Sequence, residues 1–148
     1  MGEGPLTYNS LMNPRQTIGY KNNNALNIRY YNLNKWQGQI GADRGFCKFY
    51  DMAYGIRAGI IILRKYIARG EDTIFKIIRI WAPPCENNTE AYIKNVSVSV
   101  GIHRHTRIDI KDKDTICKIV EAMIKQECAG LKVGRSIIEK GYELAVSA

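Results

Sequence analysis

The residue best suited to chemistry is Glu127, a carboxylate near the end of a helix expected over 115–130. The apolar residues of this stretch recur at helical spacing and predict one buried stripe: Ile116, Ile119, Val120, Met123 and Ile124. Glu127 occupies the next position on that stripe, in the last turn before Gly130, which can cap the helix. Burial and the negative end of the helix dipole would both favour the protonated acid.

A carboxyl group in that position is suited to general acid catalysis near neutral pH. The same spacing also describes a partly exposed Glu at a frayed helix end, because most charged helix residues are only solvated. A second carboxylate, Glu86, follows the double proline at 83–84 and precedes Asn87 and Asn88. This stretch predicts either one wall of a cleft or an interhelix turn with capping residues.

The composition favours one basic globular domain with an anionic partner. The 148 residues suit a single core, and the net charge of +8 favours nucleic acid, a membrane surface or an acidic polymer such as a bacterial cell wall. Basic residues are spread from Arg15 to Lys140 rather than collected in a tail. A nucleic-acid binder is disfavoured because no recognition motif accompanies the charge.

Metal and cofactor chemistry finds little support. The four cysteines form no CxxC pair, and His103 and His105 alone provide too few metal ligands. The glycines at 38, 41 and 45 are spaced for hairpin turns rather than for a phosphate-binding loop. We therefore expect no metal and no cofactor, and we interpret the cysteines as reduced thiols of a protein made in a cytoplasm.

The first residues show no basic region followed by an apolar run, so we expect no secretory signal. The longest apolar stretch, 58–63, is too short to span a bilayer, and membrane insertion is not expected. A target outside the cytoplasm would then require a separate delivery route.

The chain pattern predicts a loose arm over 1–14 and a single domain over 15–148. Strand formers suggest about three short antiparallel strands, at 26–31, 36–40 and 46–50. Periodicity and capping residues predict helices over 52–69, 73–81, 89–100, the stretch ending near 130, and 135–146. Asp51 and Asp72 are expected to cap the first two of these helices. The fold class is thus α+β, mostly helical, with a small sheet near the N-terminus.

Aromatic residues beside cations in this region suit a sugar polymer. Arg29 precedes two tyrosines, and Lys35 precedes Trp36. Aromatic faces pack on pyranose rings, and Asn side chains can bond hydroxyl and acetamido groups. The alternative is that these aromatics belong to the core of the small sheet, although Trp36 is the one most expected to be exposed.

Several motifs from about Tyr20 to Ala145 form a distinctive set. In chain order they are Lys21-Asn-Asn-Asn-Ala-Leu-Asn-Ile-Arg-Tyr30, Trp36-Gln-Gly38, Gly45-Phe46, Phe49, Tyr54-Gly-Ile-Arg-Ala58, Leu63 with Tyr66, Thr73-Ile74, Trp81-Ala-Pro-Pro84, Glu86-Asn87, Thr89, Tyr92-Ile93 and Val96. The set resembles a phage-associated family usually described as virion structural proteins. Its members look like lysozyme-superfamily wall hydrolases, which implies a lysozyme-like single domain.

A second resemblance, to flagellar-type glucosaminidases, rests on Asn23-Asn24 through Arg29, then Trp36 and Phe49-Tyr50. In those enzymes the catalytic Glu stands upstream of the Asn-Asn motif, but the only earlier acid here is Glu3. The phage family instead carries a late Glu-Asn-Gly step, which the stretch from Glu127 to Gly130 resembles with Cys-Ala in place of Asn. Our hypothesis is a circular permutation in which the helix ending at Glu127 replaces the first catalytic helix.

The resemblance implies a peptidoglycan-cleaving glycosidase: a muramidase, a glucosaminidase or a lytic transglycosylase. Glu127 would be the general acid/base, and Glu86, ahead of Asp43, the candidate second carboxylate. The residues expected to bind the saccharide are Asn23, Asn24, Arg29, Trp36 and Tyr92. The alternative is a non-enzymatic virion structural or wall-binding protein with the same fold.

In either case, the resemblance implies partners and a route of delivery. The expected partners are peptidoglycan and other virion proteins. The protein would be made in the bacterial cytoplasm and would act at the cell wall through a virion, a holin or another delivery route.

Overall fold

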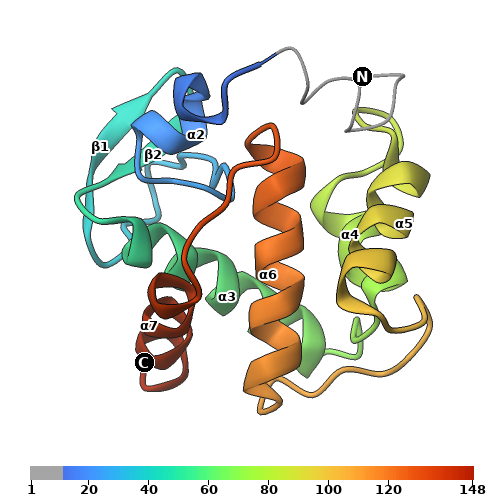
Figure 1. Cartoon of the computed structure of the whole chain (residues 1–148). Helices are drawn as coiled ribbons and strands as arrows, with labels where there is room; N and C mark the ends of the chain where they lie inside the picture. Colours follow the sequence, from blue (N-terminus) through green and yellow to red (C-terminus); the bar gives the residue numbers. More distant parts are fainter. Residues whose placement is uncertain (1–11) are drawn as a thin grey trace.

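The computed structural model describes residues 12–148, so most of the arm expected over 1–14 lies outside the described residues. Its elements, in chain order, are η1 (Pro14–Gln16), α2 (Ile18–Lys21), β1 (Gln39–Asp43), β2 (Phe46–Phe49), α3 (Met52–Ala68), α4 (Ile74–Trp81), α5 (Thr89–Val100), α6 (Lys113–Glu127) and α7 (Arg135–Val146) (Figure 1). The fold is α+β, mostly helical with a small antiparallel sheet near the N-terminus, as the sequence predicts. Within the described residues, no helix combines the length and the apolar character needed to cross a bilayer.

Local side chains set most helix starts. The side chains of Asp51, Asn88 and Asp112 each accept a backbone N–H at the start of α3, α5 and α6. The prediction that Asp72 caps α4 was wrong, because Thr73 Oγ1 accepts the Lys76 N–H at 3.1 Å. The Asp72 carboxylate instead accepts from Arg107 Nε at 2.9 Å.

The sheet has two strands among the described residues rather than the three expected. β1 and β2 pair antiparallel, with Ala42 opposite Cys47. The segment expected as the first strand, 26–31, contributes a single bridge between Arg29 and Phe46. It turns before that bridge because Asn27 has a φ of 54°. The second strand begins later than expected because Gly38, with a φ of 80°, turns the chain.

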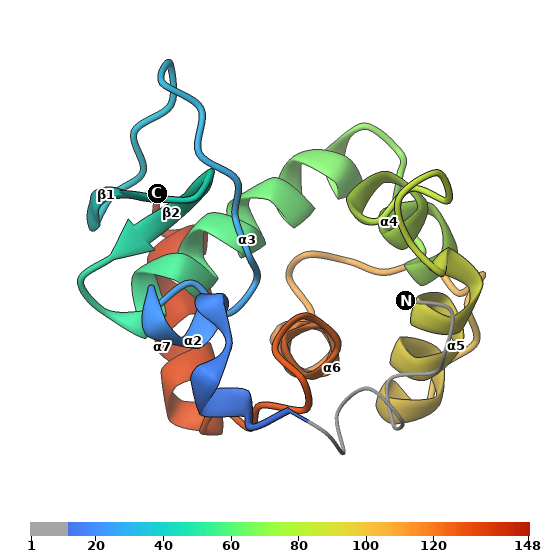
Figure 2. The ribbon, with the colours of Figure 1, turned by 90° about the horizontal axis from the view of Figure 1, so that it is seen from above.

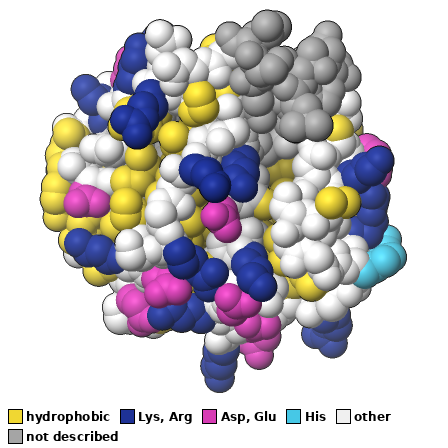
Figure 3. Space-filling view, viewed as in Figure 1, with side chains coloured by type: hydrophobic (Ala, Val, Ile, Leu, Met, Phe, Trp, Pro, Cys, Tyr) yellow, Lys and Arg dark blue, Asp and Glu magenta, His cyan; other side chains and the backbone are white. Residues whose placement is uncertain are grey.

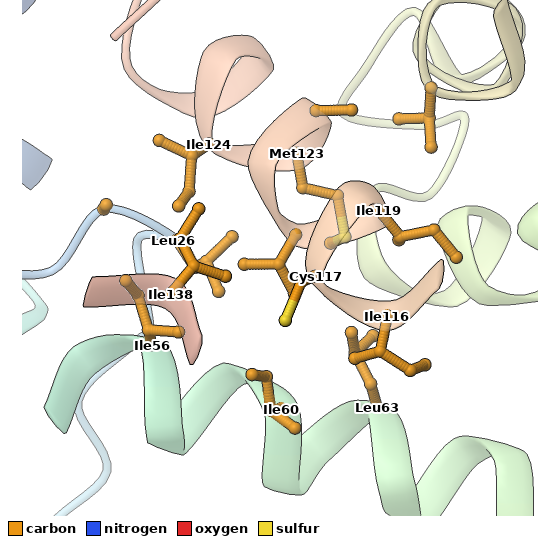
Figure 4. Close-up of a cluster of buried hydrophobic side chains, with 14 of the residues drawn as sticks. Leu26, Ile56, Ile60, Leu63, Ile116, Cys117, Ile119, Met123, Ile124 and Ile138 are labelled. Atoms are coloured by element: carbon orange, nitrogen blue, oxygen red, sulfur yellow. The ribbon is translucent and has the colours of Figure 1, made fainter. Parts of the chain in front are cut away.

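Helix α6 lies at the centre of the molecule. Seen along its axis in Figure 2, it is surrounded by α2, α3, α4, α5 and α7. The whole predicted apolar stripe of α6 is buried: Ile116, Ile119, Val120, Met123 and Ile124. Figure 4 shows most of this stripe packed with side chains from the segment before β1, from α3 and from α7: Leu26, Ile56, Ile60, Leu63 and Ile138. The prediction of a buried stripe leading toward Glu127 is therefore confirmed.

A glycine lets α3 lie directly against the segment that precedes the hairpin. A Cβ added at Gly55 would stand 2.5 Å from the backbone oxygen of Asn23 and 3.2 Å from the Cα of Asn24. Both neighbours are backbone atoms, so they cannot rotate away as a side-chain end would. The close approach thus fixes the 23–24 backbone against the first turns of α3.

Replacing Gly55 by Ala should destabilise the protein by about 1–3 kcal/mol, the usual cost of overpacking. This cost exceeds the gain of at most about 1 kcal/mol from better helix propensity. Chemical denaturation measures the free energy of unfolding. Gly41→Ala is the control, since a Cβ there meets nothing within 4 Å and its φ is not in the left-handed region. Equal stabilities for the two variants would contradict the close approach.

Candidate functional site

A pocket of about 580 Å³ opens where several parts of the chain meet. The 26–36 segment, α3, the turn after α4 and the C-terminal end of α6 all contribute to its lining. Arg29 and Trp36 come from the first of these parts, Glu86 from the turn and Glu127 from α6. The volume is in the range of small-molecule sites and is large enough for a saccharide unit.

Three neutral donors hold the Glu127 carboxyl group at this pocket. Its Oε1 accepts from Asn27 Nδ2 at 3.0 Å. Its Oε2 accepts from Trp81 Nε1 at 3.2 Å and from the Tyr92 hydroxyl at 2.9 Å. Asn27 lies before the hairpin, Trp81 ends α4 and Tyr92 lies on α5. One carboxyl group at the end of α6 is therefore bonded to three other parts of the fold.

Burial controls the acidity of this group. It raises the pKa of Glu127 above its ordinary value, while the donors Asn27, Tyr92 and Trp81 and the nearby charge of Arg29 act in the opposite direction. Burial, together with the Glu127 charge, raises the pKa of Tyr92 well above its ordinary value, so Tyr92 remains a protonated phenol. The direction of the shift at Glu127 is the one that general acid catalysis requires.

Four of the sequence-predicted residues line the pocket: Glu127, Glu86, Arg29 and Trp36. Tyr92 is buried and reaches the site through its bond to Glu127 rather than by lining the pocket. Asp43 is not part of the lining; it lies on the hairpin, where the Arg44 guanidinium lowers its pKa.

Asn23 and Asn24 do not line the pocket, and their amides are used within the fold. Asn24 is buried, and its Nδ2 donates to the backbone oxygens of Ile28 at 3.0 Å and Cys47 at 2.9 Å. Asn23 Nδ2 donates to the backbone oxygen of Phe49 at 3.1 Å. These bonds attach the segment before the hairpin to β2, which places Asn27 at Glu127.

Sequence reasoning missed Asn27 and Trp81 as partners of the acid. Asn27 stood inside an alternating stretch that predicted a strand, and Trp81 fitted the apolar face of a helix. No spacing rule could pair Asn27 with Glu127, because the two residues are 100 positions apart. The tryptophan indole N–H was the one available signal, since a buried indole usually has a hydrogen-bond partner.

Cys128, the departure from the phage-family pattern, anchors the end of α6. Its thiol is buried and donates to the Ala25 backbone oxygen at 3.3 Å. Burial raises its pKa to about 11, so it stays a thiol rather than a reactive thiolate. Ala129 and Gly130 follow with φ of 54° and 86°, which turn the chain away from the helix.

Metal ligands do not gather in the part of the chain that the structure describes. No group of three or more His, Cys, Asp or Glu side chains is placed there to hold an ion. His103 and His105 are exposed on the loop before α6, with ring centroids 5.5 Å apart.

These features define a small basic α+β protein with a carboxyl group held at a pocket, and comparison shows that it belongs to a family of phage proteins. The relative that shows this is Protein P5 of Pseudoalteromonas phage PM2. The two are 36% identical over 130 residues, which cover 84% of this chain and 79% of the phage protein. No protein-family model matches the chain.

The raised pKa of Glu127 makes stability depend on pH in a defined direction. A folded-state pKa above the ordinary value of 4.5 means that the native state binds this proton more tightly than the unfolded chain does. The contribution of Glu127 to stability is therefore full below that value and is lost as the pH rises through the folded-state pKa. From about pH 4 to about pH 7, the difference in free energy of unfolding should shift in favour of Glu127→Gln over the parent protein. Chemical denaturation of both proteins at a series of pH values measures this difference.

A difference that stays constant with pH, or shifts in favour of the parent, would contradict the prediction. It would mean that the three donors stabilise the carboxylate more than burial disfavours it.

Proposed function

We propose that this protein is a glycosidase that cleaves the sugar backbone of peptidoglycan. In this proposal Glu127 is the general acid that protonates the glycosidic oxygen. The observation that carries it is the Glu127 carboxyl group at the pocket. Burial raises the pKa of this group, and three neutral donors set its position. The muramidase, glucosaminidase and lytic transglycosylase reactions all begin with this protonation.

The hydrogen bonds support a proton that can be transferred. The indole N–H of Trp81 and the Asn27 amide nitrogen can only donate, so neither can accept a proton from Glu127. The Tyr92 hydroxyl can both donate and accept a hydrogen bond. It can therefore accept from Oε2 when Oε2 is protonated and donate to it when it is not. An acid held in this way keeps its orientation in both protonation states, as general acid/base catalysis requires.

The second carboxylate of a two-acid mechanism would be Glu86. It lines the same pocket as Glu127 and is exposed, whereas Asp43 is not part of the lining. Glycosidases of the single-Glu type dispense with such a group, and in that case Glu86 would only bind substrate. The test of Glu86 below separates these two mechanisms.

The permutation hypothesis gains support from the neighbours of Glu127. The helix ending at Glu127 contacts the segment that carries the Asn23-Asn24 motif, through the bond from Asn27 and the bond from the Cys128 thiol to Ala25. In flagellar-type glucosaminidases a catalytic helix directly precedes such a segment in sequence. Here the same neighbourhood would be formed by elements from opposite ends of the chain, within a lysozyme-like domain.

Membership in a phage protein family supports one route by which the protein could reach the cell wall. We propose that the protein reaches the cell wall as part of a virion, with other virion proteins as partners. The positive net charge would favour contact with the anionic wall.

Glu127→Gln should lower cleavage of purified peptidoglycan by about 100-fold or more, because general acid catalysis typically contributes that much. The change keeps the size of the side chain and removes the transferable proton. Release of soluble fragments from purified sacculi measures the rate, and circular dichroism verifies folding. The matched control is Glu121→Gln, which removes the same charge from the same helix outside the pocket. Retained cleavage in a folded Glu127→Gln protein would remove Glu127 from this role.

Glu86→Gln distinguishes the two mechanisms. If Glu86 is the second carboxylate, its replacement should lower the rate constant kcat by about 100-fold. If a single Glu suffices, the change should alter KM and leave kcat within a few-fold. Kinetics on soluble peptidoglycan fragments, with products separated by chromatography, also show whether water or an internal hydroxyl completes the reaction.

The second candidate function is a non-enzymatic virion structural or wall-binding protein with the same fold. The observation that favours it is that Glu127 joins three separate parts of the fold, which is also what a purely structural carboxylate would do. This candidate predicts no fragment release by the parent protein, together with binding to sacculi or to virion components in pull-down assays.

A further inference from the structure

The pocket contains two positive charges that have no ion-pair partner among residues 12–148. Arg29 and Lys65 both line it, and both are exposed. Some cations elsewhere on the described surface form ion pairs, as Arg104 does with Glu90 and Arg135 with Asp114, but many do not, so Arg29 and Lys65 are distinguished by their place in the pocket. Figure 3 shows the same pattern on one face, where several Lys and Arg side chains stand beside acidic ones. The unpaired charges at the pocket are thus available to a ligand.

Arg29 is held in place by its neighbours. Its guanidinium carbon lies 5.2 Å from the centroid of the Phe46 ring, and its backbone bridges to the same residue. Its backbone oxygen also accepts from the Cys47 thiol at 3.5 Å. The charge is near enough to Glu127 to lower the pKa of that acid. The contact with the Phe46 ring restrains the guanidinium in part, which reduces the freedom that it loses when it binds an anionic group.

Lys65 brings the second charge from a different element. It lies on α3, next to Tyr66, which also lines the pocket. Glu86 is on the turn after α4, so the acidic and cationic groups of the lining come from different elements. An anionic group in the pocket would be attracted toward Arg29 and Lys65 and repelled by Glu86, and also by Glu127 when its carboxyl group is ionised.

We propose that the pocket is selective for a glycan that carries carboxylate groups, and that Arg29 and Lys65 determine this selectivity. The inference rests on the proposed function, because it takes peptidoglycan as the substrate. Peptidoglycan and chitin share N-acetylated sugars, but only peptidoglycan carries peptide stems with free carboxylates. Arg29 can bind such a carboxylate through two parallel hydrogen bonds, and Lys65 adds a point charge.

The test is a binding experiment with the full chain carrying Glu127→Gln, so that cleavage does not interfere. Its probes are purified peptidoglycan sacculi, sacculi whose carboxylates have been converted to amides with a carbodiimide and ethanolamine, and chitin. Binding to native sacculi should be about tenfold or more tighter than to the other two. Adding Arg29→Gln and Lys65→Gln should remove that preference, because binding to native sacculi should weaken about tenfold more than binding to chitin. Arg29→Lys, which keeps the charge but not the paired bonds, should retain part of it.

The control is a Lys132→Gln and Lys140→Gln double variant, which removes the same charge from exposed positions outside the pocket. It should keep the preference for native sacculi. An equal loss in this control would overturn the proposal in favour of a general effect of net charge. Equal binding to native and amidated sacculi, or no binding to sacculi, would also overturn it.

The outcome is independent of the test of catalysis. A parent protein that releases no fragments but shows the preference would disprove the glycosidase and leave the selectivity standing. A parent protein that cleaves sacculi and chitin oligosaccharides at equal rates would support the glycosidase and disprove the selectivity.

Discussion

The carboxyl group of Glu127 is the interaction on which the site depends. It accepts hydrogen bonds from three side chains that belong to three separate parts of the chain. Each such hydrogen bond contributes about 0.5–1.5 kcal/mol when the carboxyl is neutral, and more when it is ionised. Losing a partner would leave a buried polar group unsatisfied, so the three donors constrain where α4, α5 and the segment before the hairpin can lie.

The core brings these parts to the same place. The apolar stripe of α6 is buried at the centre of the molecule, which fixes the direction in which the helix end points. Asn24 and the close approach at Gly55 hold the segment before the hairpin against β2 and α3. The Cys128 thiol then bonds that segment to the end of α6. The position of Asn27 at Glu127 is thus a consequence of packing on both sides.

The same carboxyl group can have a structural and a chemical role, and its surroundings contain features of both. An acid with neutral donors on both oxygens stabilises contacts between elements, and the upward shift of its pKa is in the direction that a general acid needs. Membership in a phage protein family is compatible with either role, because a shared fold does not by itself fix an activity. The residues that can distinguish the roles are those that line the same pocket as Glu127, namely Glu86, Arg29 and Trp36.

The sequence by itself determined the features that depend on neighbours along the chain. Periodicity and capping residues located α3, α5, α6 and α7 within a few residues, and the stripe of α6 placed Glu127 on the inward-facing side. These predictions succeeded because helix hydrogen bonds and side-chain spacing are local. The expected strand over 26–31 failed because the Asn24 side chain accepts the Ile28 backbone N–H and Asn27 adopts a left-handed conformation, and both override the alternating pattern. Only the tertiary structure decided that Asn27, Trp81 and Tyr92 meet at Glu127, and that Asn23 and Asn24 serve the fold instead. Contacts between residues 35 to 100 positions apart arise from the packing of whole elements, which no local pattern records.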